Sequence, residues 1–469
     1  MKKHLFMVLL LILSICTALS AKAPKYVFYF IGDGMGLTQV VGTQYFLRQQ
    51  KGELGISPLC FARFPYTGIA TSYSSDSDVT DSAASGTALA SGKKTDNGMI
   101  GMEPDMKHTV SIAEKAHALG VRVGIATSVS INHATPASFY AHQKSRNMYY
   151  AIGKELPVSG FEFFAGGGFD QALNPKDKNA PSLYDIAEKG GYQVIRGYDA
   201  FRNGPRQKEK LILVQKEGAY ENNLPYAIDA GEDDLTLTQI TEAALEVLYR
   251  KNDSKGFFLM VEGGRIDQAC HMNDAASAYR EVVDFDSAIK VAKKFYDQHP
   301  DETLIVITAD HETGGMALGT GRYAINLGAL AHQKVSRNGF SRVLNRLRHE
   351  SRDQVSWEMV KKALSDNFGF WDEVRISTDD EKALYECYQD SFVKNTKVKM
   401  AEKLYYKMEP MSTLAVRIMS RAAMVGWTTG GHTAGYIPVF AIGNGAEYFS
   451  GQSDNAELPV KIANIAGYQ

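Results

Sequence analysis

Short runs of apolar residues recur along the chain and predict the strands of one large sheet. Each run is rich in Val, Ile, Phe and Tyr and is bounded by glycine or polar residues, which is typical of strands buried on both faces. The clearest runs are 25–31, 122–128, 255–261, 303–308 and 437–442. Strands buried on both faces indicate a largely parallel sheet with helices on either side.

Segments with a helical period lie between these runs. They are 108–120, which ends at a glycine, 237–250, where Ile240, Ala244 and Leu248 share one face, and 276–299. Alternating strands and helices predict an α/β fold. We therefore expect a three-layer sandwich, with a large and mostly parallel central sheet flanked by helices, formed by residues 24–324 and 426–469.

Residues 325–425 break this alternation. The stretch is charged, helical in period and poor in strand patterns, and the apolar run at 437–442 follows it. The sequence therefore predicts a helical insertion into the α/β domain. Its role as a crown, a lid or a dimer contact is left open, and a homodimer is one expectation.

The first twenty residues predict a signal peptide. The basic start MKKH precedes an apolar run and a small-residue cleavage site near Ser20 or Ala21. A lipoprotein with Cys16 as the lipidated residue is less favoured, because Ile15 is bulkier than that processing prefers. No second long apolar run follows, so we expect an exported protein, periplasmic or extracellular, without a membrane span.

Composition narrows the class of protein. Of the 469 residues, 44% are hydrophobic and 22% are charged, which indicates a globular chain. The net charge of -2 does not indicate a basic surface that would bind polyanions, so we expect no nucleic-acid partner. Cys60, Cys270 and Cys387 follow the predicted signal peptide and allow at most one disulfide, and no pair of them has metal-ligand spacing.

Acidic residues and histidines follow three of the predicted strands. They are Asp33 after 25–31, Glu262, Asp267 and His271 after 255–261, and Asp310 and His311 after 303–308. In an open parallel sheet the carboxyl ends of the strands meet at the edge where ligands bind. Acidic turns and ion pairs four residues apart are common individually, but three such segments together indicate one site.

Carboxylates gathered at one edge would repel one another unless divalent cations lay between them. Aspartate together with histidine suits zinc, which takes nitrogen and oxygen ligands. An all-oxygen set, Asp33 with Glu262 and a hydroxyl, suits magnesium better.

A zinc ion would also explain an unusual serine. Ser82 lies next to Asp81 at the start of a helix predicted within VTDSAASGTALASGKKT, residues 79–95. The free N–H groups of a helix start favour anions there. No histidine is near in sequence and the G-x-S-x-G elbow is missing. Bound to zinc, the hydroxyl would need no general base, because zinc lowers its pKa.

With these motifs in place, the sequence resembles the alkaline phosphatases, a family of exported, metal-dependent phosphomonoesterases. The resemblance rests on an ordered set of motifs: YFIGDGMG, VTDSAASGTALASGKKT, NHATPASFYAH, SR at 145–146, MVEGGRIDQACH, TADHETGG and TGGHT. The set spans residues 26 to 442 apart from the helical stretch. It implies the hydrolysis of phosphate monoesters through a phosphoseryl intermediate.

The resemblance also implies a role for each matching position. Ser82 would be the nucleophile and Arg146 the phosphate-binding arginine, oriented by Asp81. Two zinc ions and one magnesium ion would be bound. The implied ligands are Asp267, His271 and His432 for one zinc, Asp33, Asp310, His311 and Ser82 for the other, and Asp33, Glu262 and Thr135 for magnesium, with His133 beside it.

Two positions depart from other members of the family. His133 stands where some members have aspartate, and Gln268 follows Asp267 where others place lysine or histidine near the phosphate. These departures affect the expected pH optimum and turnover but not the reaction class. We expect small phosphomonoesters of broad variety as substrates, because the groups identified all address the phosphate.

Three alternative functions remain from the sequence. One is a phosphodiesterase of the same superfamily, although such enzymes often use threonine as nucleophile and lack the third metal site. The second is a non-catalytic exported protein that binds phosphate or zinc. The third is a metal-free serine hydrolase, against which the missing elbow argues. A sulfatase is disfavoured because SAASG lacks the C/S-x-P-x-R context.

Overall fold

The computed structural model describes residues 23–216, 222–321, 323–394, 401–403 and 406–469, and its described part contains a ten-stranded central sheet. The predicted signal peptide, its cleavage site and Cys16 lie outside the described residues. The strands of the sheet, in spatial order, are β16 (Gly451–Asp454), β2 (Tyr66–Thr71), β15 (Ile437–Gly443), β8 (Thr303–Ala309), β1 (Tyr26–Gly32), β7 (Phe257–Glu262), β3 (Arg122–Thr127), β4 (Phe163–Gly166), β6 (Lys210–Val214) and β5 (Tyr192–Arg196).

The sheet is mostly parallel, as predicted, but β15 is an exception. Every neighbouring pair is parallel except the two pairs that β15 forms with β8 and β2. The prediction of a parallel strand at 437–442 was therefore wrong. The chain reaches β15 from β14 (His432–Thr433), which pairs with β9 (Glu312–Thr313) just beyond the carboxyl end of β8. From that edge the strand can only run back along β8.

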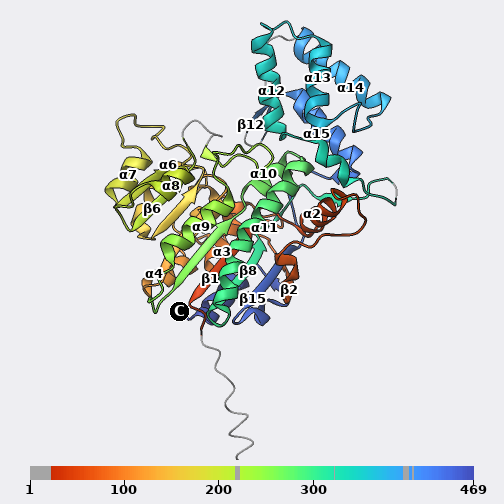
Figure 1. Cartoon of the computed structure of the whole chain (residues 1–469). Coiled ribbons are helices and arrows are strands. Elements are labelled where there is room, and N and C mark those ends of the chain that lie inside the picture. The colour runs from red at the N-terminus through yellow and green to blue at the C-terminus, as the bar shows by residue number, and fades with distance from the viewer. Residues whose placement is uncertain (1–22, 217–221, 322, 395–400, 404–405) are drawn as a thin grey trace, which may run out of the picture.

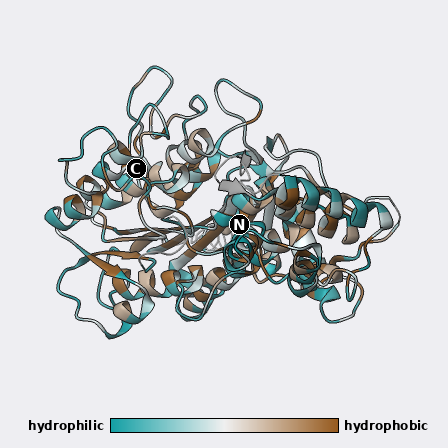
Figure 2. Ribbon diagram, turned by 90° about the horizontal axis from the view of Figure 1, so that it is seen from above, coloured by the Kyte–Doolittle hydropathy of each residue, from teal (hydrophilic) through white to brown (hydrophobic). Residues whose placement is uncertain are grey.

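Helices cover both faces of this sheet, which gives the predicted three layers. Helices α9 (Leu237–Leu248) and α11 (Ala275–Gln298) pack on one face. On the other lie α3 (Ser82–Ser91), α4 (Ile112–Ala118), α5 (Ala134–Ala137) and α16 (Glu457–Ala466). Figure 2 shows the hydrophobic strands between the two helical layers. The strands β1, β7 and β8 are buried along their whole length, so they form the centre of the core.

Local signals in the sequence set the helix boundaries. Two predicted helices, 237–250 and 276–299, correspond closely to α9 and α11. The third, predicted over 108–120, is the shorter α4, because Ser111 and Glu114 form a capping box that starts the helix at Ile112. The remaining helices of this part are α2 (Leu37–Gln49), α6 (Tyr149–Ser159), α7 (Leu183–Lys189), α8 (Tyr198–Asn203) and α10 (Arg265–His271), with short 3₁₀ turns η1 (Phe61–Arg63), η3 (Pro300–Glu302) and η6 (Ala446–Phe449).

The helices between residues 327 and 422 form a lobe at one end of the molecule, which we call the helical lobe (Figure 1). It has its own apolar core and joins the rest of the chain where β13 (Val425–Trp427) pairs with β10 (Met316–Leu318). Its elements are η4 (Leu327–His332), α12 (Arg337–Glu350), α13 (Trp357–Phe368), α14 (Thr378–Tyr388), a π-helical turn η5 (Gln389–Lys394), the strands β11 (Ala401–Lys403) and β12 (Tyr406–Met408), and α15 (Pro410–Ala422).

Two further expectations can be compared with the described residues. Within them, we find no helix with both the length and the apolar character needed to cross a bilayer. Cys60, Cys270 and Cys387 are all free thiols, and Cys270 is buried.

Candidate active site

The acidic residues and histidines expected at the sheet edge converge at the ends of three adjacent strands. Asp33 directly follows β1, Glu262 is the last residue of β7, and Asp310 and His311 directly follow β8. Since β1 lies between β7 and β8, these side chains meet at one edge. All four are fully buried, with exposed fractions of 0%.

Helix α10 and strand β14 bring a first group of three ligands together. Asp267 and His271 lie one turn apart on α10, with His271 Nε2 3.2 Å from Asp267 Oδ2. His432 comes from β14, far along the sequence. Its Nε2 lies 3.2 Å from His271 Nε2 and 3.7 Å from Asp267 Oδ1. The three side chains therefore lie together, with the two histidines facing different oxygens of the Asp267 carboxylate.

A second group forms around His311. Its Nε2 lies 3.1 Å from Asp310 Oδ2 and 3.5 Å from Asp33 Oδ1. The hydroxyl of Ser82, at the start of α3, lies 3.2 Å from the same nitrogen. His311 also contributes to a group with Asp267 and His432, so the first two groups are adjacent.

A third group lies on the other side of Asp33. The ligand atoms of Asp33, His133 and Glu262 all lie within 4.8 Å of one another. Thr135 is fully buried on the short helix α5, which begins directly after His133. Thr127, at the end of β3, donates a hydrogen bond to Glu262. The group is therefore rich in oxygen atoms.

These residues fit bound divalent cations on two observations. Ligands of a tetrahedral zinc ion lie about 3.3–3.6 Å apart, given bonds of about 2.0–2.2 Å. The separations in the first two groups, 3.1–3.7 Å, lie around this range. In addition, both oxygens of Asp33 and Oε1 of Glu262 are buried and form no hydrogen bond with the described residues. Buried carboxylate oxygens without a partner are costly, and a cation would provide one.

The pKa values of these carboxyls are shifted by burial and by their charged neighbours. Burial, together with Asp310 and the other nearby carboxylates, raises the pKa of Asp33 well above its usual value. Burial raises the pKa of Glu262 to about 8. Burial opposes the ionisation of Asp267 as well, but the charge of His271 holds the pKa of Asp267 well below its usual range. The charge of His311 likewise lowers the pKa of Asp310 despite its burial, so Asp33 and Glu262 are the two carboxyls whose ionised form lacks support.

Hydrogen bonds from the far side of each imidazole orient the three histidines. Nδ1 of His271 lies 2.7 Å from the carbonyl of Gly430, and Nδ1 of His432 lies 2.8 Å from the carbonyl of Thr80. A carbonyl only accepts, so each Nδ1 is the donor and each Nε2 is left to bind a cation. Nδ1 of His311 faces the hydroxyl of Thr313, which itself donates to Asp267 over 2.6 Å.

The sequence reasoning did not identify Thr313 or the two carbonyls as parts of the site. Thr313 lies within the TADHETGG motif, two residues after His311, and this closeness in sequence was the available signal. Carbonyl groups carry no side-chain signature, so nothing in the residue pattern singled out Gly430 or Thr80.

The start of α3 positions Ser82 beside a partly buried ion pair. Asp81 caps the helix by accepting hydrogen bonds from the backbone N–H groups of Ala84 (2.9 Å) and Gly98 (3.0 Å). Its other oxygen accepts from Arg146 Nη1 over 2.9 Å. Burial opposes ionisation, but Arg146 and the two N–H groups keep the pKa of Asp81 below its usual value. Arg146 is therefore held within the site, with Nη2 3.2 Å from His133.

The structure thus brings every residue predicted for the site into one place. They share a single sheet edge, although they come from strand ends, from helices α3, α5 and α10 and the residues just before α3 and α5, from the short strand β14 and, for Arg146, from the loop before α6. Two groups of aspartate and histidine that could hold metal ions lie beside the Ser82 hydroxyl at a helix start, and a more oxygen-rich group lies next to them. Such an arrangement suits chemistry on a polyanionic group that can bind cations, an arginine and a helix start together.

Comparisons with known proteins agree with this arrangement. The sequence model of a family described as alkaline phosphatase matches residues 24–175 and 176–468. Alkaline phosphatase 3 of Bacillus subtilis is 32% identical over 457 residues, which cover 95% of this chain and 89% of the relative. Repressible alkaline phosphatase of Saccharomyces cerevisiae is 29% identical, with 94% and 81% covered.

Solved structures show the same similarity. The cold-active alkaline phosphatase of Shewanella sp. superposes with a TM-score of 0.78 at 30% identity, and the match covers 94% of this chain and 99% of that one. A TAB5 alkaline phosphatase mutant, described with magnesium bound in its M3 site, has a TM-score of 0.65 at 26% identity, with 96% and 100% covered.

Proposed function

The chain belongs to the alkaline phosphatase family and is an enzyme of that class, and from this premise we propose that it hydrolyses phosphate monoesters through a phosphoseryl intermediate on Ser82. The observation that carries the proposal is the position of the Ser82 hydroxyl, 3.2 Å from His311 Nε2 and thus beside the Asp33, Asp310 and His311 group. A serine in that position can attack phosphorus without a neighbouring general base.

The proposed cofactors are two zinc ions and one magnesium ion. Aspartate–histidine groups suit zinc, and the oxygen-rich group suits magnesium. When bound, the cations lower the pKa of hydroxyl and water and neutralise charge on the phosphoryl oxygens. The residues proposed to hold them are Asp267, His271 and His432 for the first zinc, Asp33, Asp310, His311 and Ser82 for the second, and Asp33, Glu262 and Thr135, with His133 beside them, for magnesium.

The protein's own groups would then act in two steps. The guanidinium of Arg146, fixed by Asp81, binds phosphoryl oxygens, and the N–H groups at the start of α3 add to this attraction. The Ser82 oxygen attacks phosphorus, and the bond to the alcohol breaks, which forms phosphoserine and releases the alcohol. Water then attacks the same phosphorus from the opposite side, restores the Ser82 hydroxyl and releases inorganic phosphate.

The experiment that tests this function is capture of the intermediate. The enzyme is mixed with p-nitrophenyl phosphate, quenched in acid and digested. Mass spectrometry should find one phosphoryl group on the peptide that contains Ser82. Ser82→Ala should lack this group and hydrolyse the ester at least about a thousandfold more slowly, because the nucleophile is gone.

Ser91→Ala, at the other end of α3, is the matched control and should behave as the unchanged enzyme. Faster turnover of bis-p-nitrophenyl phosphate than of the monoester would instead identify a phosphodiesterase. Stoichiometric phosphate binding without turnover would identify a binding protein.

A further inference from the structure

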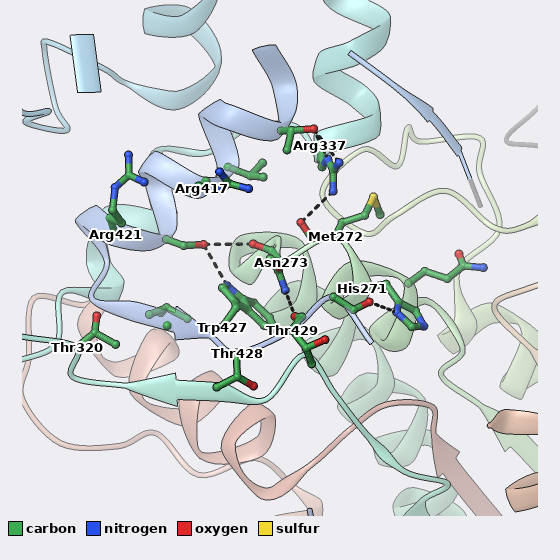
Figure 3. Close-up of a pocket in the computed structure, with 17 residues that line it drawn as sticks. His271, Met272, Asn273, Thr320, Arg337, Arg417, Arg421, Trp427, Thr428 and Thr429 are labelled. Carbon is green, nitrogen blue, oxygen red and sulfur yellow. Dashed lines mark hydrogen bonds between the residues drawn. The ribbon is translucent and has the colours of Figure 1, made fainter. Parts of the chain in front are cut away.

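A pocket of about 730 Å³ lies between the candidate active site and the helical lobe. His271, one of the proposed zinc ligands, is part of its lining, so the pocket lies next to the site. The lobe contributes three cations to its lining: Arg337 from α12, and Arg417 and Arg421 from α15. Figure 3 shows these arginines on one side of the pocket and Trp427 on the opposite side.

The lining of the pocket contains these three arginines and no aspartate or glutamate. Arg421 lies at the rim, where it is half-exposed and pairs with Asp380 outside the pocket. Arg417 is exposed and forms neither an ion pair nor a hydrogen bond with the described residues. The pocket therefore has an excess of positive charge.

Arg337 is buried, with an exposed fraction of 5%, so water screens its charge less than that of an exposed arginine. Its guanidinium donates to the hydroxyl of Thr413 from Nε (3.1 Å) and Nη2 (2.7 Å), and to the carbonyl of Met272 from Nη1 (3.2 Å). Both partners are uncharged. The nearby Asp274 accepts from the backbone N–H of Arg337 over 2.8 Å, and none of the described carboxylates forms an ion pair with its guanidinium.

Two physical consequences follow for Arg337. Three of the five N–H groups of its guanidinium are used, so two remain for a ligand. Burial lowers the pKa of Arg337, although the charge of Asp274 acts in the opposite direction. Asp274 forms no direct ion pair with this guanidinium and so offsets only part of the cost of burying the cation, and an anion bound in the pocket would offset more of it.

We propose that this pocket binds a second anionic group on the substrate, and that the enzyme prefers phosphate monoesters whose alcohol part carries another phosphate. The inference rests on the proposed function, because it places the alcohol part of a substrate held at Ser82 on the His271 side of the site. One guanidinium group can bind two oxygens of the same phosphate, and both Arg337 and Arg417 could bind the second phosphate in this way. Trp427 offers an apolar wall to the carbon skeleton between the two phosphates. The pocket thus narrows the broad specificity expected from the sequence.

The test compares two substrates that differ only in the second phosphate, fructose 1,6-bisphosphate and fructose 6-phosphate. We expect kcat/KM to be higher for the bisphosphate, and the ratio of the two values to fall as salt is added, because salt screens the exposed charge of Arg417. Arg417→Gln should lower the ratio roughly tenfold, because a charge-assisted hydrogen bond to the second phosphate is lost. Arg417→Glu should lower the ratio further, because its negative charge repels that phosphate.

Arg346→Gln is the matched control, since Arg346 is exposed on α12 outside the pocket and should leave the ratio unchanged. Because Arg417 is exposed and unpartnered, its variants should fold. A ratio that is the same in the unchanged enzyme and both Arg417 variants would overturn the subsite and leave the phosphatase function standing. Failure of the unchanged enzyme to hydrolyse either substrate, with no phosphoserine formed, would overturn both.

Discussion

The hydroxyl of Ser82 owes its proposed reactivity to its surroundings and not to a neighbouring base. In a metal-free serine hydrolase a histidine next to the serine must accept the proton. Here the imidazole of His311 also faces Asp33 and Asp310, and its Nε2 belongs to a cluster that could hold a cation. The same nitrogen cannot hold a cation and accept a proton, so we infer that the bound cation activates the serine.

A buried carboxyl outside this site makes a pH-dependent contribution to stability. Glu281 lies on α11 and accepts a hydrogen bond from the backbone N–H of Ala227 over 2.6 Å. Burial, with the neighbouring Asp284, raises the pKa of Glu281 to about 8. Its pKa in an unfolded chain is about 4.3. Between these values the folded protein holds a proton that the unfolded chain has released, so this group makes stability fall as pH rises.

We expect Glu281→Gln to remove this dependence, because glutamine resembles the protonated acid and still accepts from Ala227. The difference in free energy of unfolding between the variant and the unchanged enzyme should grow in favour of the variant from pH 5 to pH 8. The slope from one group is at most about 1.4 kcal/mol per pH unit. Urea unfolding at matched metal content measures it. Glu358→Gln, at an exposed position on α13, is the control. Parallel pH curves for all three proteins would contradict the expectation.

Helices α3 and α5 pack closely, and this contact links the nucleophile to the proposed magnesium site. α3 carries Ser82 and α5 carries Thr135. A Cβ atom added at Gly86 of α3 would lie 2.9 Å from Ser138 Oγ and 3.1 Å from the Cα atom of Thr135. The Ser138 hydroxyl can rotate away, but the backbone of Thr135 can yield only if α5 moves.

Gly86→Ala should therefore displace α5, lower the free energy of unfolding by about 1–3 kcal/mol, as overpacking does, and raise the magnesium concentration needed for full activity. Thermal unfolding and a magnesium titration measure the two effects. The control is Gly328→Ala, where the nearest atom to an added Cβ lies 3.7 Å away. Unchanged stability and unchanged magnesium dependence in Gly86→Ala would show that the α3–α5 contact is not tight.

The strands predicted from sequence are the long apolar ones at the centre of the sheet, such as β1 and β8. Those that were missed lie mainly toward its two ends and are short or mixed in polarity. β4 has only four residues, too few to distinguish from a buried loop, and β16 reads GQSD and carries no apolar signal. The direction of β15 was also missed, because an apolar run looks the same in either direction and only the preceding connection decides it.

More of the candidate site than of the surrounding fold could be predicted from the sequence. Aspartate, glutamate and histidine at the ends of predicted strands are visible in the sequence, and the structure brings them together. His432 and His133 were exceptions among the histidines, and Arg146 and Thr135 likewise came only from the family resemblance. His432 reaches the site through the pairing of β14 with β9. The cationic pocket was not predicted, since Arg337 and Arg417 lie on separate helices that meet only in the folded lobe.

The described part of the chain combines a mostly parallel sheet, at whose edge the site residues meet, with a helical lobe that lines the adjoining pocket. We propose that residues 24–324 and 426–469 form the catalytic domain and that 325–425 is an insertion whose arginines contact the alcohol part of the substrate. Export and a homodimer remain predictions. Removal of the cations should affect the whole domain, because the carboxylates of β1, β7 and β8 would then repel one another at the centre of the sheet edge.

The most direct measurement of the central claim is metal removal followed by separate addition of zinc and magnesium, with phosphate release and bound metal per chain measured together. We predict that chelation abolishes hydrolysis, that zinc restores it as the ions bind, and that magnesium alone does not restore it but enhances the zinc-loaded enzyme. Full activity in a preparation shown to contain no metal would contradict the account.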